Sequence, residues 1–360
     1  MNASIVGAGK MGRVIAQAME KLGHNLSILD TSSEALSDCQ ELLQDDSHSY
    51  FDSPNSTALL GSDVVISAQP YYANESLAFY CIENSINYCD LGGSVPVSEK
   101  INSQAKQSQN NSSVFTDLGL APGWVNIIAE EGVKEMNGAD EVKMMVGGLP
   151  TDKGNNPLSY ITTWSIDGLL NEYRDDCTVI QNGECKTVKG MDGLETVHSQ
   201  HLGTLEAFYT SGGASHSIPS MLNKVKDCSY KTLRYPNHCE MVKFLISECE
   251  ISDDCLRDIF KKGCKQNGTK DLVIVICEVK KGSLGWRREH IVHSDESLSA
   301  MQKATAYSIS SVADLIAGGH MPKEKVLSYK DVPFDRFNEN LASLYENIRC
   351  EEGSSGRIFK

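Results

Sequence analysis

The chain begins its first apolar segment with Ser4-Ile5-Val6-Gly7-Ala8-Gly9-Lys10-Met11-Gly12, and this stretch decides the fold. A short strand runs directly into a Gly-x-Gly-x-x-Gly turn, and a helical pattern follows as far as residue 22. In such a turn the first glycine permits the tight bend, the second lets a pyrophosphate approach, and the third lets the helix pack against the strand. The N-terminus of the helix adds free N–H groups and a positive dipole end. We therefore predict that a dinucleotide binds to Gly7, Gly9, Lys10, Met11 and Gly12.

An acidic residue stands where such a site contacts the ribose. A second strand covers residues 26–29, and Asp30 follows it 18 residues after Gly12. A carboxylate here accepts hydrogen bonds from the ribose hydroxyls of NAD, and its charge repels the 2′-phosphate of NADP. We therefore predict NAD as the cofactor. The alternative is an ordinary strand-turn-helix unit with a chance acid.

Strands and helices continue to alternate up to about residue 118. The pattern predicts strands at 49–51, 63–67, 87–90 and 114–117, and helices at 34–43, 75–84 and 97–108. In an open parallel sheet, ligands bind outside the carboxyl ends of the strands. The loops at these ends provide three further candidate cofactor contacts, Gln69, Pro70 and Gly92, and a candidate substrate contact, Tyr71.

The pattern changes after residue 121. A helix is expected to about residue 136, and Asn182-Gly183 lies between two apolar runs, which is typical of a hairpin. Further strands are predicted at 142–146, 205–210, 230–235, 272–279 and 286–292, with a loop starting at Gly147 and a long helix at 298–317. The fold class is therefore α/β. We expect a Rossmann-type doubly wound parallel sheet with an α+β substrate domain of mainly antiparallel strands.

Composition narrows the possible partners of the chain. Its 360 residues carry a net charge of −15, which argues against nucleic acid or an anionic membrane surface. No apolar run approaches the roughly 20 residues of a membrane helix, and the first strand leaves no room for a signal peptide. The 12 cysteines form no Cys-x-x-Cys pair. We expect a cytoplasmic protein with reduced thiols, a small-molecule substrate and no metal.

Polar residues that suit a carboxylate ligand gather in the second half of the chain. Arg234 stands among aromatic residues near a strand end, which suits a bidentate clamp on a carboxylate. The alternative is a surface strand with an ordinary salt bridge. Thr210, beside a Gly-Gly strand end, and Lys231 are further candidate substrate contacts, although alternation puts Lys231 and Arg234 on opposite faces of the strand.

Three residues are candidates for the general base, namely Asp90, Asp117 and His238. Each also has an ordinary structural explanation. A carboxylate at a strand end often caps a helix or forms a turn, and His238 stands where a helix begins. The sequence gives no order among the three.

Six stretches spread over the chain resemble the saccharopine dehydrogenase family, and within it the lysine 6-dehydrogenase branch. The matching stretches are residues 89–93, 117–123, 147–150, 205–213, 230–235 and 304–310. Asn237 departs from that branch, which usually has Gly before the histidine. The resemblance implies an NAD-binding domain at 1–120, an inserted substrate and dimerisation domain at 121–295, and a helical segment at 296–350 that returns to the first domain. The Gly/Ser-rich composition of residues 351–360 predicts a flexible tail.

The resemblance also implies an activity. We expect a homodimer that oxidatively deaminates the terminal amine of L-lysine, or of a similar amino acid, to a semialdehyde that cyclises, releasing ammonia and NADH. One alternative is a saccharopine or carboxynorspermidine type of enzyme that reduces an imine with NAD(P)H. An alternative of another class is a non-catalytic sensor or scaffold that binds NAD.

Overall fold

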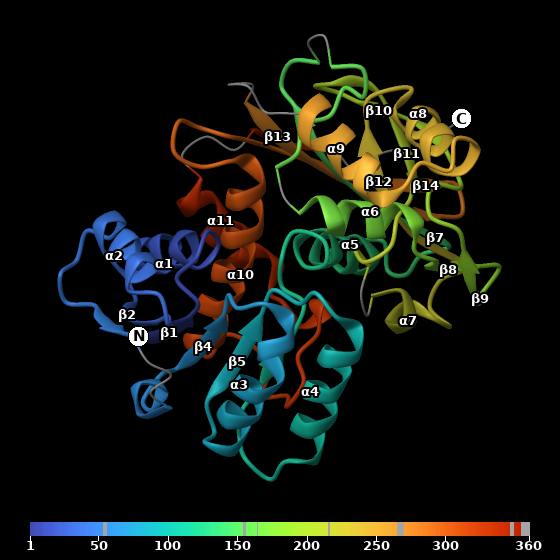
Figure 1. Cartoon of the computed structure of the whole chain (residues 1–360). Helices are drawn as coiled ribbons and strands as arrows, with labels where there is room; N and C mark the ends of the chain where they lie inside the picture. Colours follow the sequence, from blue (N-terminus) through green and yellow to red (C-terminus); the bar gives the residue numbers. More distant parts are fainter. Residues whose placement is uncertain are drawn as a thin grey trace. The chain divides into compact units, whose positions relative to one another are not determined.

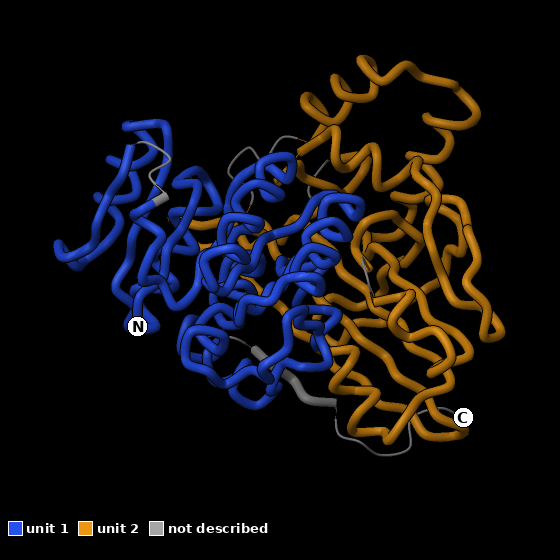
Figure 2. Tube along the Cα trace, turned by 90° about the horizontal axis from the view of Figure 1, so that it is seen from below, with its two compact units in different colours: residues 1–127, 302–347 blue, residues 128–301, 348–360 orange. Residues whose placement is uncertain are grey.

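The chain folds into two compact units. The computed structural model describes residues 1–52, 56–153, 156–163, 165–214, 217–264, 270–345 and 349–353. One unit contains residues 1–127 and 302–347, and the other contains residues 128–301 and 348–360 (Figure 2). Each unit is therefore assembled from two separate parts of the chain.

The first unit is built on a parallel six-stranded sheet with the order β3-β2-β1-β4-β5-β6 (Figure 1). Its strands are β1 (Asn2–Val6), β2 (Asn25–Leu29), β3 (Ser49–Phe51), β4 (Val64–Ser67), β5 (Asn87–Asp90) and β6 (Val114–Phe115). The strand order reverses between β1 and β4, which is the switch point where doubly wound sheets bind ligands. The predicted Rossmann-type sheet is confirmed.

Helices alternate with these strands. They are α1 (Gly12–Lys21), α2 (Ser33–Leu42), α3 (Tyr71–Glu83), α4 (Val95–Gln107), the start of α5 (Trp124–Glu135), most of α10 (Ala300–Ala317) and α11 (Phe334–Leu344). The apolar faces of α3 and α4 pack with β4 and β5 in one buried cluster that includes Val65, Ile82, Tyr88 and Ile101. Full burial of one such side chain contributes roughly 1.5–3 kcal/mol. Within the described ranges, no helix has the length and apolar character of a membrane span.

A segment near the carboxyl end extends this sheet. The backbone N–H of Val114 in β6 donates to the Lys325 carbonyl at 2.9 Å, and the N–H of Leu327 donates to the Val114 carbonyl at 2.9 Å. The Tyr329 hydroxyl donates to the Asp117 carbonyl at 2.9 Å. The last part of the chain thus completes the first unit.

The second unit contains a nine-stranded sheet with the path β10-β11-β12-β7-β13-β14-β15, and β8 pairs with both β12 and β9. The strands are β7 (Glu141–Pro150), β8 (Cys177–Gln181), β9 (Glu184–Val188), β10 (Glu195–Ser199), β11 (Gly203–Tyr209), β12 (Asp227–Arg234), β13 (Asp271–Lys281), β14 (Leu284–His293) and β15 (Arg349–Gly353). Its helices include α6 (Ile166–Arg174), α7 (Ser217–Met221), α8 (His238–Lys243) and α9 (Asp253–Gly263). The pairing is antiparallel except between β12 and β7, which confirms the expected, mainly antiparallel domain.

Four local predictions differ from the structure. The expected loop from Gly147 is the end of β7, where a Cβ on Gly147 would lie 2.7 Å from the Leu233 carbonyl oxygen. Helix α3 begins at Tyr71 rather than at residue 75. Strand β6 stops at Phe115, because Asp117 has a φ of +64° that ends the extended backbone. Residues 351–353, expected in a flexible tail, pair with β14 as part of β15, and residues 354–360 lie outside the described residues.

Candidate functional site

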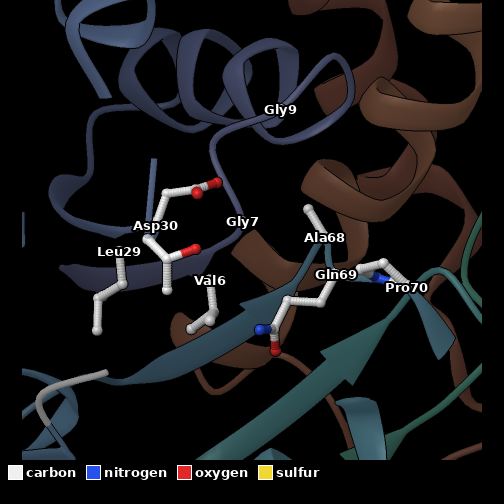
Figure 3. A pocket seen from close by; sticks show the side chains of 9 residues that line it. Val6, Gly7, Gly9, Leu29, Asp30, Ala68, Gln69 and Pro70 are labelled. Atoms are coloured by element: carbon white, nitrogen blue, oxygen red, sulfur yellow. The ribbon is translucent and has the colours of Figure 1, made fainter. Parts of the chain in front are cut away.

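A cavity of about 280 Å³ lies at the carboxyl ends of β1, β2 and β4 (Figure 3). Its position at the switch point of the sheet is where dinucleotides bind in this architecture. Five of the predicted cofactor residues line it. The full lining is Val6, Gly7, Gly9, Leu29, Asp30, Thr31, Ala68, Gln69 and Pro70.

The glycine turn has the geometry that a dinucleotide requires. Gly7 has a φ of +101°, and a Cβ on Gly12 would lie 1.7 Å from the Gly7 carbonyl oxygen, so helix and turn are in direct contact. A Cβ on Gly9 would meet no atom within 4 Å, so Gly9 leaves its side of the turn open. No side chain caps the N-terminus of α1 at Met11, and Lys10 beside it is exposed. These residues fit a pyrophosphate bound at the start of α1.

Asp30 is fixed at the edge of this cavity. Its Oδ2 accepts a hydrogen bond from the Ala8 N–H at 2.6 Å, and its Oδ1 accepts one from the Ser32 N–H at 2.9 Å. Figure 3 shows Asp30 beside the glycine turn, with Gln69 and Pro70 across from it. A fixed negative charge therefore lies where the ribose of the dinucleotide would bind.

Asp90 and Asp117 form one buried group with Gly92. Asp90 Oδ1 accepts from the N–H groups of Gly92 at 2.8 Å and Asp117 at 3.1 Å, and the Tyr88 hydroxyl donates to Oδ2 at 2.9 Å. Burial raises the pKa of the Asp90 carboxyl to about 6, and the charge of Asp117 adds to the rise. A Cβ on Gly92 would lie 2.1 Å from Asp117 Oδ1. Asp90 therefore holds together the turns that follow β5 and β6, and all its donors come from the protein.

Tyr71 lies next to these turns. It begins α3 and is 47% exposed, and a Cβ on Gly93 would lie 3.2 Å from the Tyr71 Cβ. Tyr71 thus covers the turn after β5 with an accessible aromatic ring.

Arg234 is the centre of a second cluster, which belongs to the second unit. It is the last residue of β12 and only 3% exposed. Its Nε donates to the Tyr173 hydroxyl at 3.0 Å, Nη1 donates to the Leu233 carbonyl at 2.9 Å, and its guanidinium lies 4.8 Å from the centre of the Tyr160 ring. Among the described residues, no carboxylate forms an ion pair with Arg234. Glu172 interacts with Arg234 electrostatically but forms no ion pair with it, so the buried guanidinium can still take an anionic ligand.

A chain of hydrogen bonds orients this arginine. His238 Nδ1 lies 2.8 Å from the Leu158 carbonyl, which can only accept, so Nδ1 carries the proton. Nε2 then accepts from the Tyr173 hydroxyl at 2.9 Å, and the Tyr173 oxygen is left to accept from Arg234. Burial and the nearby Arg234 lower the pKa of His238 to about 3, which keeps the ring neutral. His238 is fully buried with both nitrogens engaged, so it supports Tyr173 and has no nitrogen free for a substrate.

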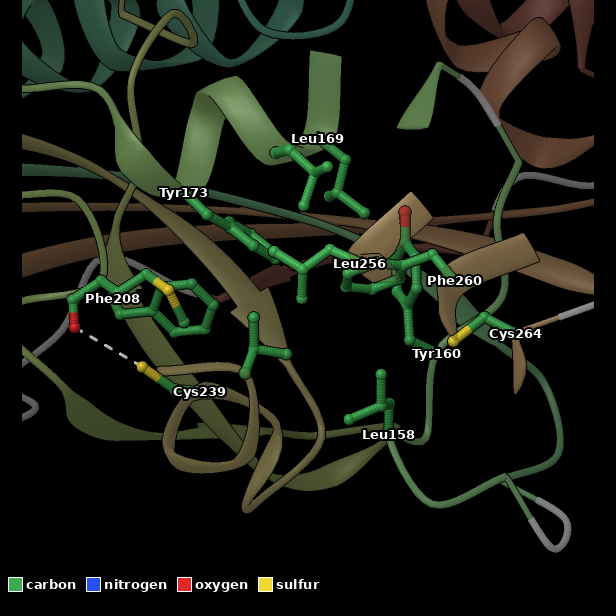
Figure 4. Close-up of a cluster of buried hydrophobic side chains, with 12 residues drawn as sticks. Leu158, Tyr160, Leu169, Tyr173, Phe208, Cys239, Leu256, Phe260 and Cys264 are labelled. Carbon is green, nitrogen blue, oxygen red and sulfur yellow. Dashed lines mark hydrogen bonds between the residues drawn. The ribbon is translucent and has the colours of Figure 1, made fainter. Parts of the chain in front are cut away.

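Apolar packing holds the same cluster in place. Figure 4 shows Tyr173 and Tyr160 among side chains from α6, α8, α9 and β11. Phe208 and Tyr173 meet edge to face with their ring centres 5.8 Å apart. The guanidinium is therefore carried by groups with little freedom to move.

The other predicted substrate contacts of this unit divide between two faces of β12. Thr210 Oγ1 lies 2.7 Å from Thr232 Oγ1, on the face that carries Arg234. Lys231 lies on the opposite face, where Nζ donates to Glu195 Oε1 at 2.7 Å and to the Gly193 carbonyl. Lys231 thus faces away from Arg234, as the alternation of side chains along a strand predicts, and its contact with the substrate stays a prediction.

Sequence reasoning missed three residues of this cluster. Tyr173 and its neighbour Glu172 lie on α6. The sequence could have indicated this helix, because Ser165 is its N-cap and the apolar residues at 169, 170 and 173 have helical spacing. Glu206 accepts from the N–H groups of Asn237 at 2.9 Å and Cys239 at 2.6 Å, which caps the start of α8. The φ of Asn237 is +78°, a conformation that Gly and Asn tolerate best, which explains why Asn can replace Gly there.

Within the described ranges, no three His, Cys, Asp or Glu side chains gather in a way that would hold a metal ion.

Comparison with known proteins agrees with this architecture. Residues 4–115 match the family model of the saccharopine dehydrogenase NADP binding domain, and residues 119–344 match that of the saccharopine dehydrogenase C-terminal domain. A solved structure, apo histidine-tagged saccharopine dehydrogenase (L-Glu forming) from Saccharomyces cerevisiae, superposes with a TM-score of 0.76 at 16% identity. That alignment covers 98% of this chain and 99% of the other, and it supports the fold.

The alignments with curated relatives cover only part of each protein. Saccharopine dehydrogenase (NADP(+), L-glutamate-forming) of Saccharomyces cerevisiae is 24% identical over 245 residues, which cover 62% of this chain and 54% of that protein. The mitochondrial alpha-aminoadipic semialdehyde synthase of Mus musculus is 29% identical over 133 residues, which cover 36% of this chain and 14% of that protein. The matches span about half of the yeast relative and much less of the mouse one. The two family models together cover most of the chain, so it belongs to the saccharopine dehydrogenase family.

Proposed function

We propose that the protein is an NAD-dependent oxidoreductase that acts on a carbon–nitrogen bond of an amino acid, with saccharopine as the first candidate substrate. The family membership and the name of the yeast relative support this choice of substrate class. The observation that carries it is Arg234, a buried guanidinium without a carboxylate partner among the described residues. This is what a protein needs to bind the carboxylate of an amino acid.

The reaction requires a substrate carboxylate to be held and a proton to be removed from nitrogen. When bound, the oxidised nicotinamide accepts a hydride from the carbon next to that nitrogen. A protonated amine has no lone pair to assist this transfer, so the nitrogen must first lose a proton. Water then adds to the carbon of the C=N bond, and cleavage of the C–N bond leaves an aldehyde and an amine. From saccharopine the products are a semialdehyde and L-glutamate.

Residues of this chain have distinct parts in the proposal. Arg234 holds a substrate carboxylate, and Tyr173 and His238 fix its guanidinium. Asp90 holds the turns after β5 and β6 and takes no proton from the substrate. Asp117 and Tyr71 lie at the carboxyl ends of the strands in the cofactor-binding unit, where a substrate would meet the nicotinamide.

NAD is proposed as the cofactor on the strength of Asp30. Its carboxylate is fixed by two backbone N–H groups at the edge of the cavity. The 2′-phosphate of NADP would meet this charge at close range, and such repulsion between like charges weakens binding. NADP, which the names of the matching domain model and the yeast relative contain, is the competing cofactor.

A second candidate substrate is L-lysine, and one observation favours it. Saccharopine has three carboxylates, whereas lysine has one. Three cations of the second unit that are candidates for holding further carboxylates are already paired, namely Lys231 with Glu195, Arg174 with Asp253 and Lys243 with Asp192. A substrate with a single carboxylate needs fewer unpaired cations for its binding.

The test is a cofactor-reduction assay with the purified chain. Saccharopine, L-lysine and L-ornithine are each offered with NAD and with NADP at mildly alkaline pH, and the absorbance of the reduced cofactor is followed. We expect NAD to be reduced with saccharopine, L-glutamate to form, and NADP to react at least about tenfold less efficiently. Reduction with lysine and release of ammonia would select the second candidate. Tight binding of NAD without turnover of any amine would contradict both and indicate a non-catalytic NAD-binding protein.

A further inference from the structure

We propose that Glu172 and Arg234 together bind the α-amino-acid head group of the substrate, with Glu172 on the ammonium and Arg234 on the carboxylate. This inference deepens the proposed function and rests on it. It assigns a specificity-determining residue to a helix that contributes nothing to the cofactor cavity.

Glu172 is fixed beside the arginine by its helix. It precedes Tyr173, whose hydroxyl accepts from Arg234 Nε at 3.0 Å. The Glu172 carbonyl accepts from the Ser211 N–H at 3.0 Å, which ties α6 to the segment that follows β11 and contains Thr210. The same segment places Thr210 against Thr232 on the Arg234 face of β12. Helix and strand end are thus held together around one polar site.

The two opposite charges are close without being paired. Burial raises the pKa of Glu172 to about 7, and the charge of Arg234 opposes that rise, so the carboxyl and the guanidinium interact. Among the described residues, neither forms an ion pair with the other or with a third side chain. Arg234 is buried and Glu172 is partly exposed, so a ligand that reaches both side chains can supply a partner for each charge.

An α-amino acid supplies both partners at once. Its carboxylate and its ammonium are joined by a single carbon, so they can serve a guanidinium and a carboxyl group that interact without forming an ion pair. The hydroxyls of Tyr230, Thr232 and Thr210 on the same side of the sheet offer further hydrogen bonds. The site therefore selects a zwitterion over a simple carboxylate or a simple amine.

The surroundings of Glu172 predict how binding depends on pH. Arg234 and Tyr230 of β12, Tyr173 of its own helix and Cys177 of β8 are the titratable groups that interact with it. Burial raises the pKa of Tyr230, Tyr173 and Cys177, so these three stay neutral near pH 7. Among these groups, Glu172 is then the one that loses its proton between pH 6 and pH 8. The carboxylate that forms attracts an ammonium.

The test uses three small probes on the full chain with saturating NAD. L-Norleucine has the complete head group, hexanoate has the carboxylate alone, and 1-aminopentane has the ammonium alone. Calorimetry gives the Kd of each for the wild type, for Glu172→Gln and for Glu240→Gln, an exposed acid of the same unit that serves as the matched control.

We expect the wild type at pH 8 to bind norleucine at least about tenfold more tightly than hexanoate, as a charge-assisted hydrogen bond allows. Glu172→Gln should lose this preference and bind hexanoate at least as well as the wild type. Glu240→Gln should keep the preference. In the wild type the ratio of the two affinities should fall severalfold from pH 8 to pH 6, a readout that needs no variant.

Two outcomes would overturn the inference. One is a norleucine preference that survives in Glu172→Gln, and the other is an affinity ratio that does not change with pH. Either result, together with turnover of saccharopine or lysine, would leave the proposed function standing. A preference that depends on Glu172, in a protein that turns over no amine, would keep the head-group site and contradict the proposed reaction.

Discussion

Asp90 shows how a residue that suggests chemistry can serve the fold instead. It is completely buried, and three protein groups donate to its carboxylate. Its pKa is nevertheless raised to about 6, because burial and the charge of Asp117 outweigh those hydrogen bonds. The folded protein therefore holds the Asp90 proton more tightly than the unfolded chain does. The resulting stability is present below about pH 4 and is lost as pH rises through about 6.

We predict that Asp90→Asn removes this loss of stability at rising pH. A shift of about two pKa units corresponds to about 3 kcal/mol, so the Tm of the variant relative to the wild type should rise between pH 4 and pH 7. Asn keeps one oxygen for the N–H groups of Gly92 and Asp117, and its amide can donate to the Tyr88 hydroxyl. Asp46→Asn, at an exposed acid of the same unit, is the control and should show no such trend. A variant that folds and binds NAD but loses turnover about a hundredfold would instead make Asp90 the general base.

The sequence predicts a single site residue well where the structure at that position requires one residue type. Gly7, Gly9 and Asp30 could be identified because a dinucleotide turn needs them, and they line one cavity. Alternation along the strand also separates Lys231 from Arg234, and in the structure Lys231 is bonded to Glu195 on the opposite face. Glu172 could not be identified from sequence, because a helical acid is ordinarily a solvated surface residue.

The strand-turn-helix from β1 to α1 is the element that most constrains the first unit. A Cβ on Gly12 would lie 1.7 Å from a backbone oxygen, whereas a Cβ on Gly9 would meet nothing within 4 Å. The two glycines therefore have separable roles, one in packing the helix and one in admitting the pyrophosphate.

We predict that Gly12→Ala lowers the free energy of unfolding by about 2–3 kcal/mol, as an added methyl group in a close-packed contact does. Gly9→Ala should leave unfolding in urea unchanged and weaken NAD binding at least about tenfold, because its methyl group would occupy the approach of the pyrophosphate. Denaturation curves and NAD titrations of both variants separate the two effects. Equal stability of Gly12→Ala and the wild type would refute the packing role.

Prediction of elements succeeded where one periodicity dominates. The alternation of the first unit and the Asn182-Gly183 hairpin both appear, and the two turn residues have φ values of +54° and +80°. Gly147 and Gly148 were read as a loop because glycine ordinarily interrupts strands. Pairing of β7 with β12 on one side and β13 on the other overrides that preference, and the missing side chain of Gly147 permits the close approach.

At the scale of the whole molecule, the chain leaves the first unit and returns to it. Local pattern alone could not place residues 325–327 beside β6, because that pairing joins segments about two hundred residues apart with few hydrogen bonds. The resemblance to a family supplied this order of segments. The homodimer and the cytoplasmic location that were expected stay predictions.

We assign the dinucleotide to the first unit and the substrate carboxylate to Arg234 of the second. The measurement that tests this division most directly is the steady-state and binding analysis of Arg234→Lys. Lysine keeps the charge but lacks the planar fork of five donors. Arg174→Lys, at an arginine of the same unit that is paired with Asp253, is the matched control.

We predict that Arg234→Lys raises the KM for the amino-acid substrate at least about tenfold and leaves the Kd for NAD unchanged, while Arg174→Lys alters neither. Circular dichroism and the Tm of each variant show that the fold is retained. An unchanged KM in a folded Arg234→Lys, or equal loss of substrate and NAD affinity, would contradict the central claim.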